Sequence, residues 1–286
     1  MVTSDILNNI IDNSPWRNYL HDIYCQTNKQ LLYYEHVDVI HPADKPVVDA
    51  YNKRRQSDCQ FNRHLLAVPF QGNPLSAKVV FLTLNPGYIE RINKDVAQML
   101  DAENIGCTRF SLRINEYWSE CYDHRARSLF PSKKDDRDVY TAFQILGDWY
   151  WYDMFASLRK DCYLDDDTFA EKVAIMQLIP YHSVRCENIT LDLPTQQYSK
   201  QLILYMLEQP DSPQFVVMRS EKKWAELLGV DFRDSKYKDK FILRKADKNE
   251  NPPRKQFISE KAFAQPDDYA KIVNAIKTDL KIYKVK

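Results

Sequence analysis

Four short apolar runs occur along the chain from residue 78 onward, and each one stops at polar or turn-forming residues. The runs are continuous, without an alternating polar face, and β-branched and aromatic side chains are frequent in them. This pattern is typical of strands that are buried on both faces of a parallel sheet. We therefore predict strands at residues 78–84, 174–179, 214–218 and 240–244.

The first of these strands ends at a turn that the strand cannot pass. Pro86 has no amide hydrogen for a sheet ladder, and Gly87 tolerates a positive φ. Apolar residues then recur near helical spacing over residues 88–100, so the unit is a strand, a tight polar turn and a helix. Such a turn lies at the carboxyl end of the strand and directs the amides of a helix N-terminus toward a ligand.

Further helical patterns separate the later strands. Apolar residues at helical spacing predict helices over residues 139–160, 197–209 and 221–228, and a last helix that begins near Asp267. Thr195 and Ser220 are the predicted N-caps of two of them, and Gly229 is the predicted stop of the helix over 221–228. Because strands alternate with helices, we expect right-handed crossovers and an α/β fold with a central four-stranded parallel sheet.

The first sixty residues lack this alternation. Their pattern is helical and irregular, which predicts a helical N-terminal extension at residues 1–60 and an α/β domain at residues 61–286. The most basic short cluster of the extension is Lys53-Arg54-Arg55, which fits a solvated helix face and also a contact with phosphates. Residues 101–138 form a predicted insertion in which basic and aromatic residues alternate, as they do in nucleic-acid grooves.

The polar residues that follow the predicted strands are the candidate site. Ligands of parallel α/β sheets bind beyond the carboxyl ends of the strands. Four segments are therefore expected to converge there: Asn85-Pro86-Gly87-Tyr88, Tyr181-His182-Ser183, Arg219-Ser220, and the loop that holds Asn251. This expectation follows from periodicity alone.

Three stretches of the chain carry a resemblance to a known family. Leu84-Asn85-Pro86-Gly87, at the end of an apolar strand, resembles the first active-site motif of the uracil-DNA glycosylase superfamily, in the form of its mismatch-specific members. Residues 69–74 resemble the loop that leads into that strand, and residues 256–263 with Asp268-Tyr269 resemble the closing segment of the family. The resemblance implies a three-layer α/β fold, with helices on both faces of the sheet, and hydrolysis of the N-glycosidic bond of a flipped base in DNA.

The resemblance assigns roles to the residues of the first two segments. Excision requires a base held outside the stack, a water placed at C1′, and donors that meet the charge growing on the departing base. The resemblance implies that Asn85 orients the water, while His182 is the candidate imidazole for the leaving group. Tyr88 or Tyr181 would stack on the base, and Glu90 completes a Pro-Gly-x-x-Glu pattern known from other branches of the superfamily.

The second motif of the family departs from its usual form. A His-Pro-Ser segment is expected after the last strand, and this region instead reads Asn249-Glu250-Asn251-Pro252-Pro253-Arg254. An amide donor, Asn251, would then replace the electrophilic imidazole at the leaving base. Pro86, Gly87, Ser183 and Arg219-Ser220 remain as candidate contacts of the base.

Composition limits the function classes. The chain has 286 residues, and 40 Lys and Arg balance 40 Asp and Glu, so the formal charge is zero. Nucleic-acid binders usually carry a basic excess, and the balance also argues against electrostatic attachment to anionic membranes. No apolar run is long enough to span a bilayer, and no signal pattern is present.

The cysteines and histidines do not suggest a cofactor. No Cys-x-x-Cys and no paired Cys/His spacing occurs, so we expect no metal, no iron–sulfur cluster and no other cofactor. Scattered cysteines fit a reducing, cytoplasmic location. The six cysteines are Cys25, Cys59, Cys107, Cys121, Cys162 and Cys186.

Two other function classes remain open beside the glycosylase interpretation. The same pocket would serve a binding module that holds a nucleotide or a flipped base without cleaving it, and the zero charge and the missing His favour that class. A hydrolase of small nucleotides is the third, and it would show turnover on free nucleosides. Product analysis with oligonucleotides separates the three.

Overall fold

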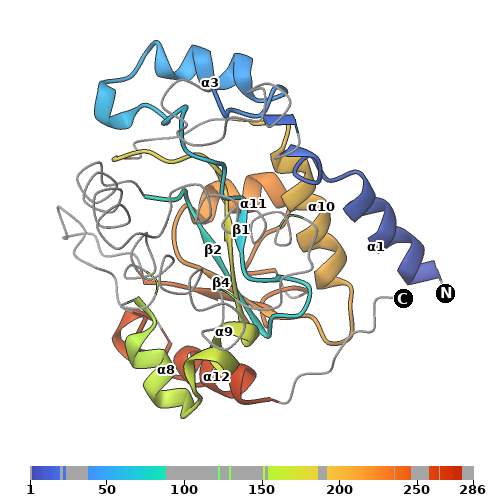
Figure 1. Cartoon of the computed structure of the whole chain (residues 1–286). Helices are drawn as coiled ribbons and strands as arrows, with labels where there is room; N and C mark the ends of the chain where they lie inside the picture. Colours follow the sequence, from blue (N-terminus) through green and yellow to red (C-terminus); the bar gives the residue numbers. More distant parts are fainter. Residues whose placement is uncertain are drawn as a thin grey trace, which may run out of the picture. The chain divides into compact units, whose positions relative to one another are not determined.

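The computed structural model describes residues 2–19, 22–23, 38–87, 122, 129, 151, 154–185, 192–234, 236–245, 258–263 and 265–278. It is an α/β structure with a five-stranded mixed sheet in the order β1-β3-β2-β4-β5 (Figure 1). The strands are β1 (Phe70–Gln71), β2 (Val79–Thr83), β3 (Val173–Gln177), β4 (Gln214–Val217) and β5 (Phe241–Leu243).

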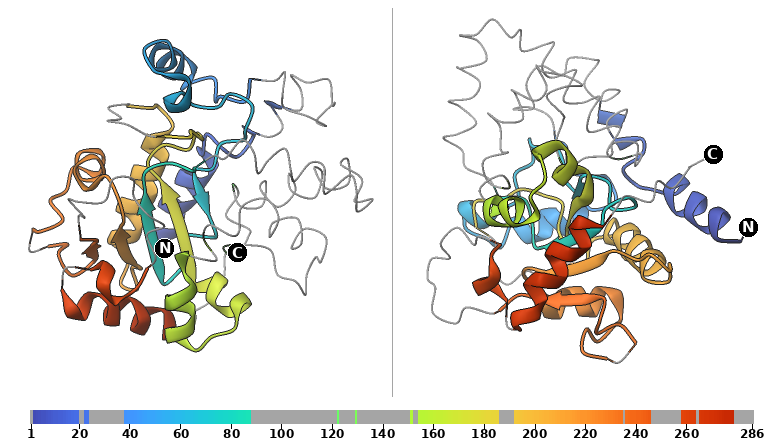
Figure 2. Two further views of the ribbon diagram at one scale, coloured as in Figure 1. Left: turned by 90° about the vertical axis from the view of Figure 1, so that its left-hand side faces the viewer. Right: turned by 90° about the horizontal axis from the view of Figure 1, so that it is seen from below.

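Helices in the described residues precede, separate and follow these strands. They are α1 (Val2–Asp12), α3 (Lys45–Asn52), α8 (Ala156–Cys162), α9 (Asp166–Lys172), α10 (Gln196–Leu207), α11 (Glu221–Leu228) and α12 (Pro266–Lys277), with short 3₁₀ turns η2 (Ser57–Cys59) and η4 (Glu260–Ala262). α12 packs against α8 and against β2, and α8 and α12 lie side by side in Figures 1 and 2. Within the described residues, none of these helices combines the length and apolarity that a bilayer crossing requires.

All four predicted strands are present, and their pairing is parallel. β2 pairs with β4 in the register Val80 to Phe215, and β4 pairs with β5 in the register Val216 to Ile242. β3 runs parallel to β2. The amide of Lys78 donates to Lys172 O near the start of both strands, and the amide of Ile179 donates to Leu84 O beyond the end of both.

The fifth strand, β1, corrects the prediction of a four-stranded parallel sheet. The amide of Val68 donates to Pro180 O (2.7 Å), and the amide of Gln177 donates to Pro69 O (2.9 Å). The partner of the earlier residue, Val68, is later in the chain than the partner of Pro69. The segment that leads into β1 therefore runs antiparallel to β3. Two residues between Pro69 and Gly72 carry no periodic signal, and for that reason the sequence indicated only a loop.

The core of the sheet explains why these runs become strands. Every residue of β2 and β3 is buried, and a fully buried aliphatic or aromatic side chain contributes about 1.5–3 kcal/mol by leaving water. Two polar groups at the end of β2 and on α11 are paired within this core. Thr83 Oγ1 donates to Met176 O (3.1 Å), and the indole nitrogen of Trp224 donates to Thr83 O (3.0 Å).

The predicted caps are only partly confirmed. Gly229 ends α11 at φ 69, as expected. Ser220 is the N-cap of α11, but its φ of 59 places it in the left-handed region and its side chain makes no capping bond. Thr195 directly precedes α10, but in the described part of the chain no helix amide donates to its hydroxyl; its amide and its hydroxyl donate to the buried carboxylate of Asp44.

By compactness, the chain divides into two units. The first comprises Met1–Phe70, Leu84–Ala126 and Gln177–Tyr205, and the second comprises Gln71–Thr83, Arg127–Met176 and Met206–Lys286. The boundary expected at residue 60 stays a prediction. Among the described residues each unit holds one buried cysteine, Cys59 in the first and Cys162 in the second.

Candidate functional site

Asn85 is held by one edge of its side-chain amide. Its Nδ2 donates to Ser183 Oγ (2.9 Å), to Tyr181 O (3.3 Å) and to Pro86 O (3.2 Å). Two of these acceptors are carbonyl oxygens, which cannot donate, so they fix which end of the amide is nitrogen. In the described part of the chain Oδ1 has no hydrogen-bond partner, and it is not sealed from solvent. The side chain therefore presents one oriented acceptor to whatever binds there.

The turn after β2 differs from the predicted one. Gly87 pairs with Ser183 in an isolated parallel bridge, and its φ is not positive. The strand pairing thus breaks at Asn85-Pro86 and resumes at Gly87. Pro86 is buried, whereas Gly87 is exposed, and a Cβ added to Gly87 would meet no atom of the described residues within 4 Å. As far as the described residues extend, the backbone beside the Asn85 amide is open to close approach.

His182 is tied to the same turn by its ring. Its Nδ1 donates to Gly87 O (3.1 Å), since a carbonyl can only accept. The pKa of His182 lies below its ordinary 6.5 because the ring is withdrawn from water, and backbone groups of Gly87 and Leu66 oppose that shift. The His182 ring is therefore neutral, and its hydrogen bond links Gly87 to the segment 181–183.

Tyr181 has a different role from the stacking expected of it. Its side chain is 0% exposed, its hydroxyl donates to Asp44 Oδ2 (2.8 Å), and it accepts from the amide of His41 (3.2 Å). A ring in this position is not available to a base. Tyr181 contributes to the site through its backbone carbonyl, which accepts from Asn85.

Asp44 is the functional neighbour that the sequence did not indicate. It is 0% exposed, and its carboxylate accepts from Tyr181 Oη, from the amide of Thr195 (3.0 Å) and from Thr195 Oγ1 (2.5 Å). Proximity to this carboxylate and burial both raise the pKa of the Tyr181 phenol, burial most, so the phenol stays protonated as a donor. The only signal in the sequence is an Asp before Lys45-Pro46 at the start of α3, which looks like an ordinary N-cap but makes no capping bond.

A second segment supports the site from the N-terminal side. The amide of Asn62 donates to His182 O (2.8 Å), and the amide of Arg185 donates to Asp58 O (2.8 Å). Residues 58–62 therefore run along residues 182–185, and an ion pair joins Arg185 to Asp58 (3.4 Å). Part of the predicted N-terminal extension is in this way part of the site's framework.

The remaining predicted site residues lie either outside the described residues or in the other compact unit. Tyr88, Glu90 and Asn251 lie outside the described residues. Arg219, which is exposed, and Ser220 belong to the second compact unit, whereas Asn85, Tyr181, His182 and Ser183 belong to the first. The cluster that the first unit assembles is thus Asn85, Gly87 and the segment 181–183.

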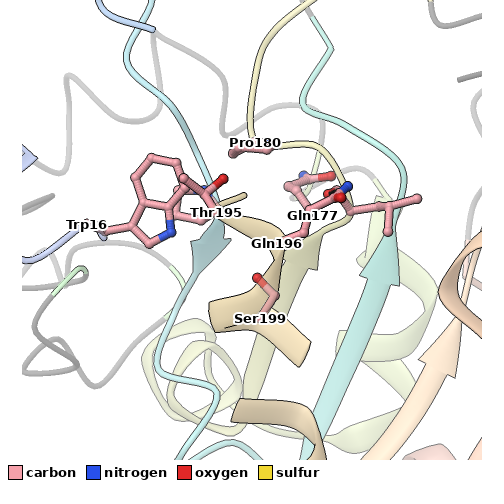
Figure 3. A pocket seen from close by; sticks show the side chains of 8 residues that line it. Trp16, Gln177, Pro180, Thr195, Gln196 and Ser199 are labelled. Atoms are coloured by element: carbon pink, nitrogen blue, oxygen red, sulfur yellow. Dashed lines mark hydrogen bonds between the residues drawn. The ribbon is translucent and has the colours of Figure 1, made fainter. Parts of the chain in front are cut away.

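A hollow elsewhere in the first unit is not the ligand site. It is lined by Trp16, Pro69, Gln177, Leu178, Pro180, Thr195, Gln196 and Ser199, and it is too narrow to admit a water molecule (Figure 3). The indole nitrogen of Trp16 is buried there without a hydrogen-bond partner in the described part of the chain. Among the described residues, no group of His, Cys, Asp and Glu is arranged to hold a metal ion.

The chemistry available at the cluster follows from its free atoms. Asn85 Oδ1 can accept a hydrogen from a water and orient it, but an amide is not a general base. The exposed backbone at Gly87 leaves room for a flat ligand to approach. No protein-family model, no curated protein and no solved structure matches this chain.

Proposed function

We propose that this chain is a uracil-DNA glycosylase-like protein that takes up a flipped base of DNA at Asn85 and hydrolyses its N-glycosidic bond. The observation that carries the proposal is the Asn85 amide, whose nitrogen is bound on one side while its oxygen is left open. A turn asparagine that served only the backbone would not need two anchors from a segment almost a hundred residues away. The proposal includes the three-layer arrangement of that superfamily.

In the proposed reaction Asn85 acts by orientation. Its Oδ1 accepts a hydrogen from the attacking water and directs the oxygen lone pair toward C1′. Because no carboxylate takes the proton, the water attacks C1′ late, when the bond to the base is largely broken, and the proton that it loses goes to the departing base anion. Donors must then meet the charge on the departing base, and the proposal leaves this role to Asn251 and to the backbone near Gly87, since His182 Nδ1 is already bound.

A binding module is the second candidate, and one observation favours it. The His182 ring is clipped to Gly87 O, so its Nδ1 is not a free donor for a leaving base. A protein of this kind would hold the base on the Gly87 backbone and leave the bond intact. The same experiment separates the two.

The test is excision from oligonucleotides that contain uracil or hypoxanthine, scored as abasic sites. We expect cleavage by the wild type and at least a hundredfold slower cleavage by Asn85→Ala, as when one oriented polar group at the reacting centre is removed (about 10²–10³). Asn13→Ala is the matched control, because Asn13 bonds only to Asn9 on the exposed face near α1. Asn85→Asp should not restore or raise the rate, since a carboxylate would face the carbonyls of Pro86 and Tyr181.

The outcomes are distinct. If the wild type binds the oligonucleotides but produces no abasic sites with any base, and Asn85→Ala abolishes the binding, the protein is a binding module and not an enzyme. Turnover restricted to free nucleosides would indicate a small-nucleotide hydrolase. Equal rates for wild type and Asn85→Ala would contradict the role of the amide.

A further inference from the structure

Three consecutive cations at the end of α3 lack the carboxylate partners that their neighbours have. Lys53 and Arg54 are exposed, Arg55 is half-buried, and within the described part of the chain none of the three is in an ion pair. We call these residues the α3 basic cluster. Three other cations of the first unit do have carboxylate partners. Lys45 and Arg63 pair with Asp38, Arg63 pairs with Asp49 as well, and Arg185 pairs with Asp58.

An aromatic column connects this cluster to the candidate site. The guanidinium of Arg55 lies 5.0 Å from the centre of the Tyr51 ring, and the Tyr51 ring stacks on Phe61 at 4.9 Å with an interplanar angle of 25°. Phe61 contacts Tyr181 at 6.2 Å, and the carbonyl of Tyr181 holds the Asn85 amide. The four residues of the column, which are one arginine and three aromatic residues, belong to the first compact unit.

Hydrogen bonds make the same connection rigid. The side chain of Asn52, the last residue of α3, accepts from the amide of Phe61 (2.9 Å) and donates to its carbonyl (3.0 Å). Gln60 Nε2 donates to the carbonyls of Asn52 (2.9 Å) and Arg55 (3.0 Å). The next residue, Asn62, donates to His182 O. The basic cluster is therefore fixed with respect to the segment that carries the site.

The charge and its placement fit a polyanion better than an isolated solvated helix face. Because the Arg55 guanidinium is already held on the buried Tyr51 ring, it loses less side-chain freedom when it binds a phosphate than a freely solvated arginine would. A formal charge of zero for the whole chain does not oppose this, since the neighbouring acids are already committed to other cations. One guanidinium held on a ring and two exposed cations next to it, on the framework that carries the candidate site, form a surface that a phosphate backbone can contact.

We propose that Lys53, Arg54 and Arg55 bind the phosphate backbone of the nucleic-acid strand whose base reaches Asn85. The inference rests on the proposed function, and it specifies the ligand as a strand with several phosphates rather than a free base or nucleoside. Phosphate contacts of this kind position the strand and carry no sequence preference.

The test is the salt dependence of binding to a fluorescent single-stranded oligonucleotide of about 16 nucleotides. The slope of log affinity against log salt is negative, and each contacted phosphate adds about 0.7 to its magnitude, so we expect the variant Lys53→Gln/Arg54→Gln/Arg55→Gln to make the slope less steep by about 2. Between about 50 and 200 mM salt, the wild type should then lose about 20-fold more affinity than the variant. The matched control is Lys222→Gln/Lys223→Gln/Arg233→Gln, which removes three exposed cations of the second unit that already pair with Glu226 and Glu221.

Each outcome decides the proposal. A less steep slope for the cluster variant alone, with an unchanged thermal midpoint, supports it whether or not abasic sites form, so its success does not depend on catalysis. An unchanged slope overturns it, even if excision is observed and Asn85 is essential. Equal effects of the two triple variants, no binding of the oligonucleotide by the wild type, or equally strong binding to phosphatidylserine vesicles would also overturn it.

Discussion

At the scale of single residues, Asn85 shows what its sequence position alone does not. Its anchors, Tyr181 O and Ser183 Oγ, are 96 and 98 residues away in the chain. An apolar run followed by Asn-Pro-Gly indicates a strand end, and the convergence of residues 85 and 181–183 was predictable from the ends of parallel strands. The direction of the amide was not, because it depends on which carbonyls the partner segment turns inward.

Gly87 offers a direct check on where a ligand lies. A Cβ at this position meets open space, and its φ is not positive. Gly87→Ala should therefore keep the thermal midpoint of the wild type, while binding of a base-containing oligonucleotide weakens at least about tenfold, or about 1.4 kcal/mol, because the methyl group occupies the approach to the backbone. Fluorescence anisotropy measures the affinity, and unchanged affinity would show that the ligand lies elsewhere.

Two half-buried histidines, His41 and His182, predict how stability depends on pH. The pKa values of His41 and His182 lie below the ordinary 6.5, in both cases chiefly because burial disfavours the charged ring. The unfolded chain then takes up protons before the folded one does, so stability should fall as the pH drops through about 6.5 and level off below the folded pKa. The Asp38 carboxyl, with its pKa lowered from 3.8, acts only at more acidic pH.

Urea unfolding between about pH 7.5 and about pH 5 measures this effect. His182→Gln should flatten part of the decline, because one of the two groups no longer titrates. Stability that is constant or rises on acidification in this range would contradict the prediction.

At the scale of elements, the strands were the best predicted features and the caps were the worst. Continuous apolar runs such as 79–83 and 173–177 are typical of strands that are buried on both faces, and here this pattern was sufficient to locate the strands. Thr195 and Ser220 are good caps by residue type, yet Thr195 is bound by Asp44 and Ser220 has a φ of 59. Tertiary contacts override such local preferences, and a single sequence does not reveal them.

The turn between β1 and β2 has a glycine, Gly72, whose replacement should be costly. Gly72 has a φ of 71, and a Cβ there would lie 2.8 Å from Val173 O and 3.1 Å from the Cα of Leu129. Gly229, at the end of α11, has a similar φ of 69 and open space around it. Gly229→Ala should cost only the left-handed strain, about 1–2 kcal/mol.

Gly72→Ala should lower the free energy of unfolding more than Gly229→Ala does. The additional clash is with backbone atoms, which do not yield easily, and overpacking of this kind adds about 1–3 kcal/mol. Chemical denaturation of the two variants gives the difference. Equal losses of unfolding free energy would mean that the backbone around Gly72 relaxes at little cost.

At the scale of the whole molecule, the early part of the chain is more integrated than its pattern indicates. Residues 38–60 carry no alternation of strand and helix, and from sequence they were assigned to the N-terminal extension. In the structure Asp44 binds Tyr181 and Thr195, and the carbonyl of Asp58 accepts from the amide of Arg185. Such contacts between distant segments leave no period in the sequence, so the fold class was predictable and this part of the site was not.

Asp44 therefore has a large predicted effect on stability. Asp44→Ala leaves the Tyr181 hydroxyl and the amide and hydroxyl of Thr195 buried without their acceptor, and each such group costs about 1–3 kcal/mol. We expect a loss of at least about 3 kcal/mol in the free energy of unfolding. Asp49→Ala is the control from the same helix, because its ion pair with Arg63 is partly exposed and should contribute less than about 1 kcal/mol.

The buried thiols give each half of the molecule its own chemical reporter. Cys59 lies in the first compact unit and Cys162 in the second, and burial raises the pKa of the Cys162 thiol to about 11, so almost no thiolate is present in the native state. Alkylation at either position must wait for an opening event. Pulses of iodoacetamide followed by peptide mass spectrometry would time the opening of the two halves separately, and identical rates would reveal one cooperative transition.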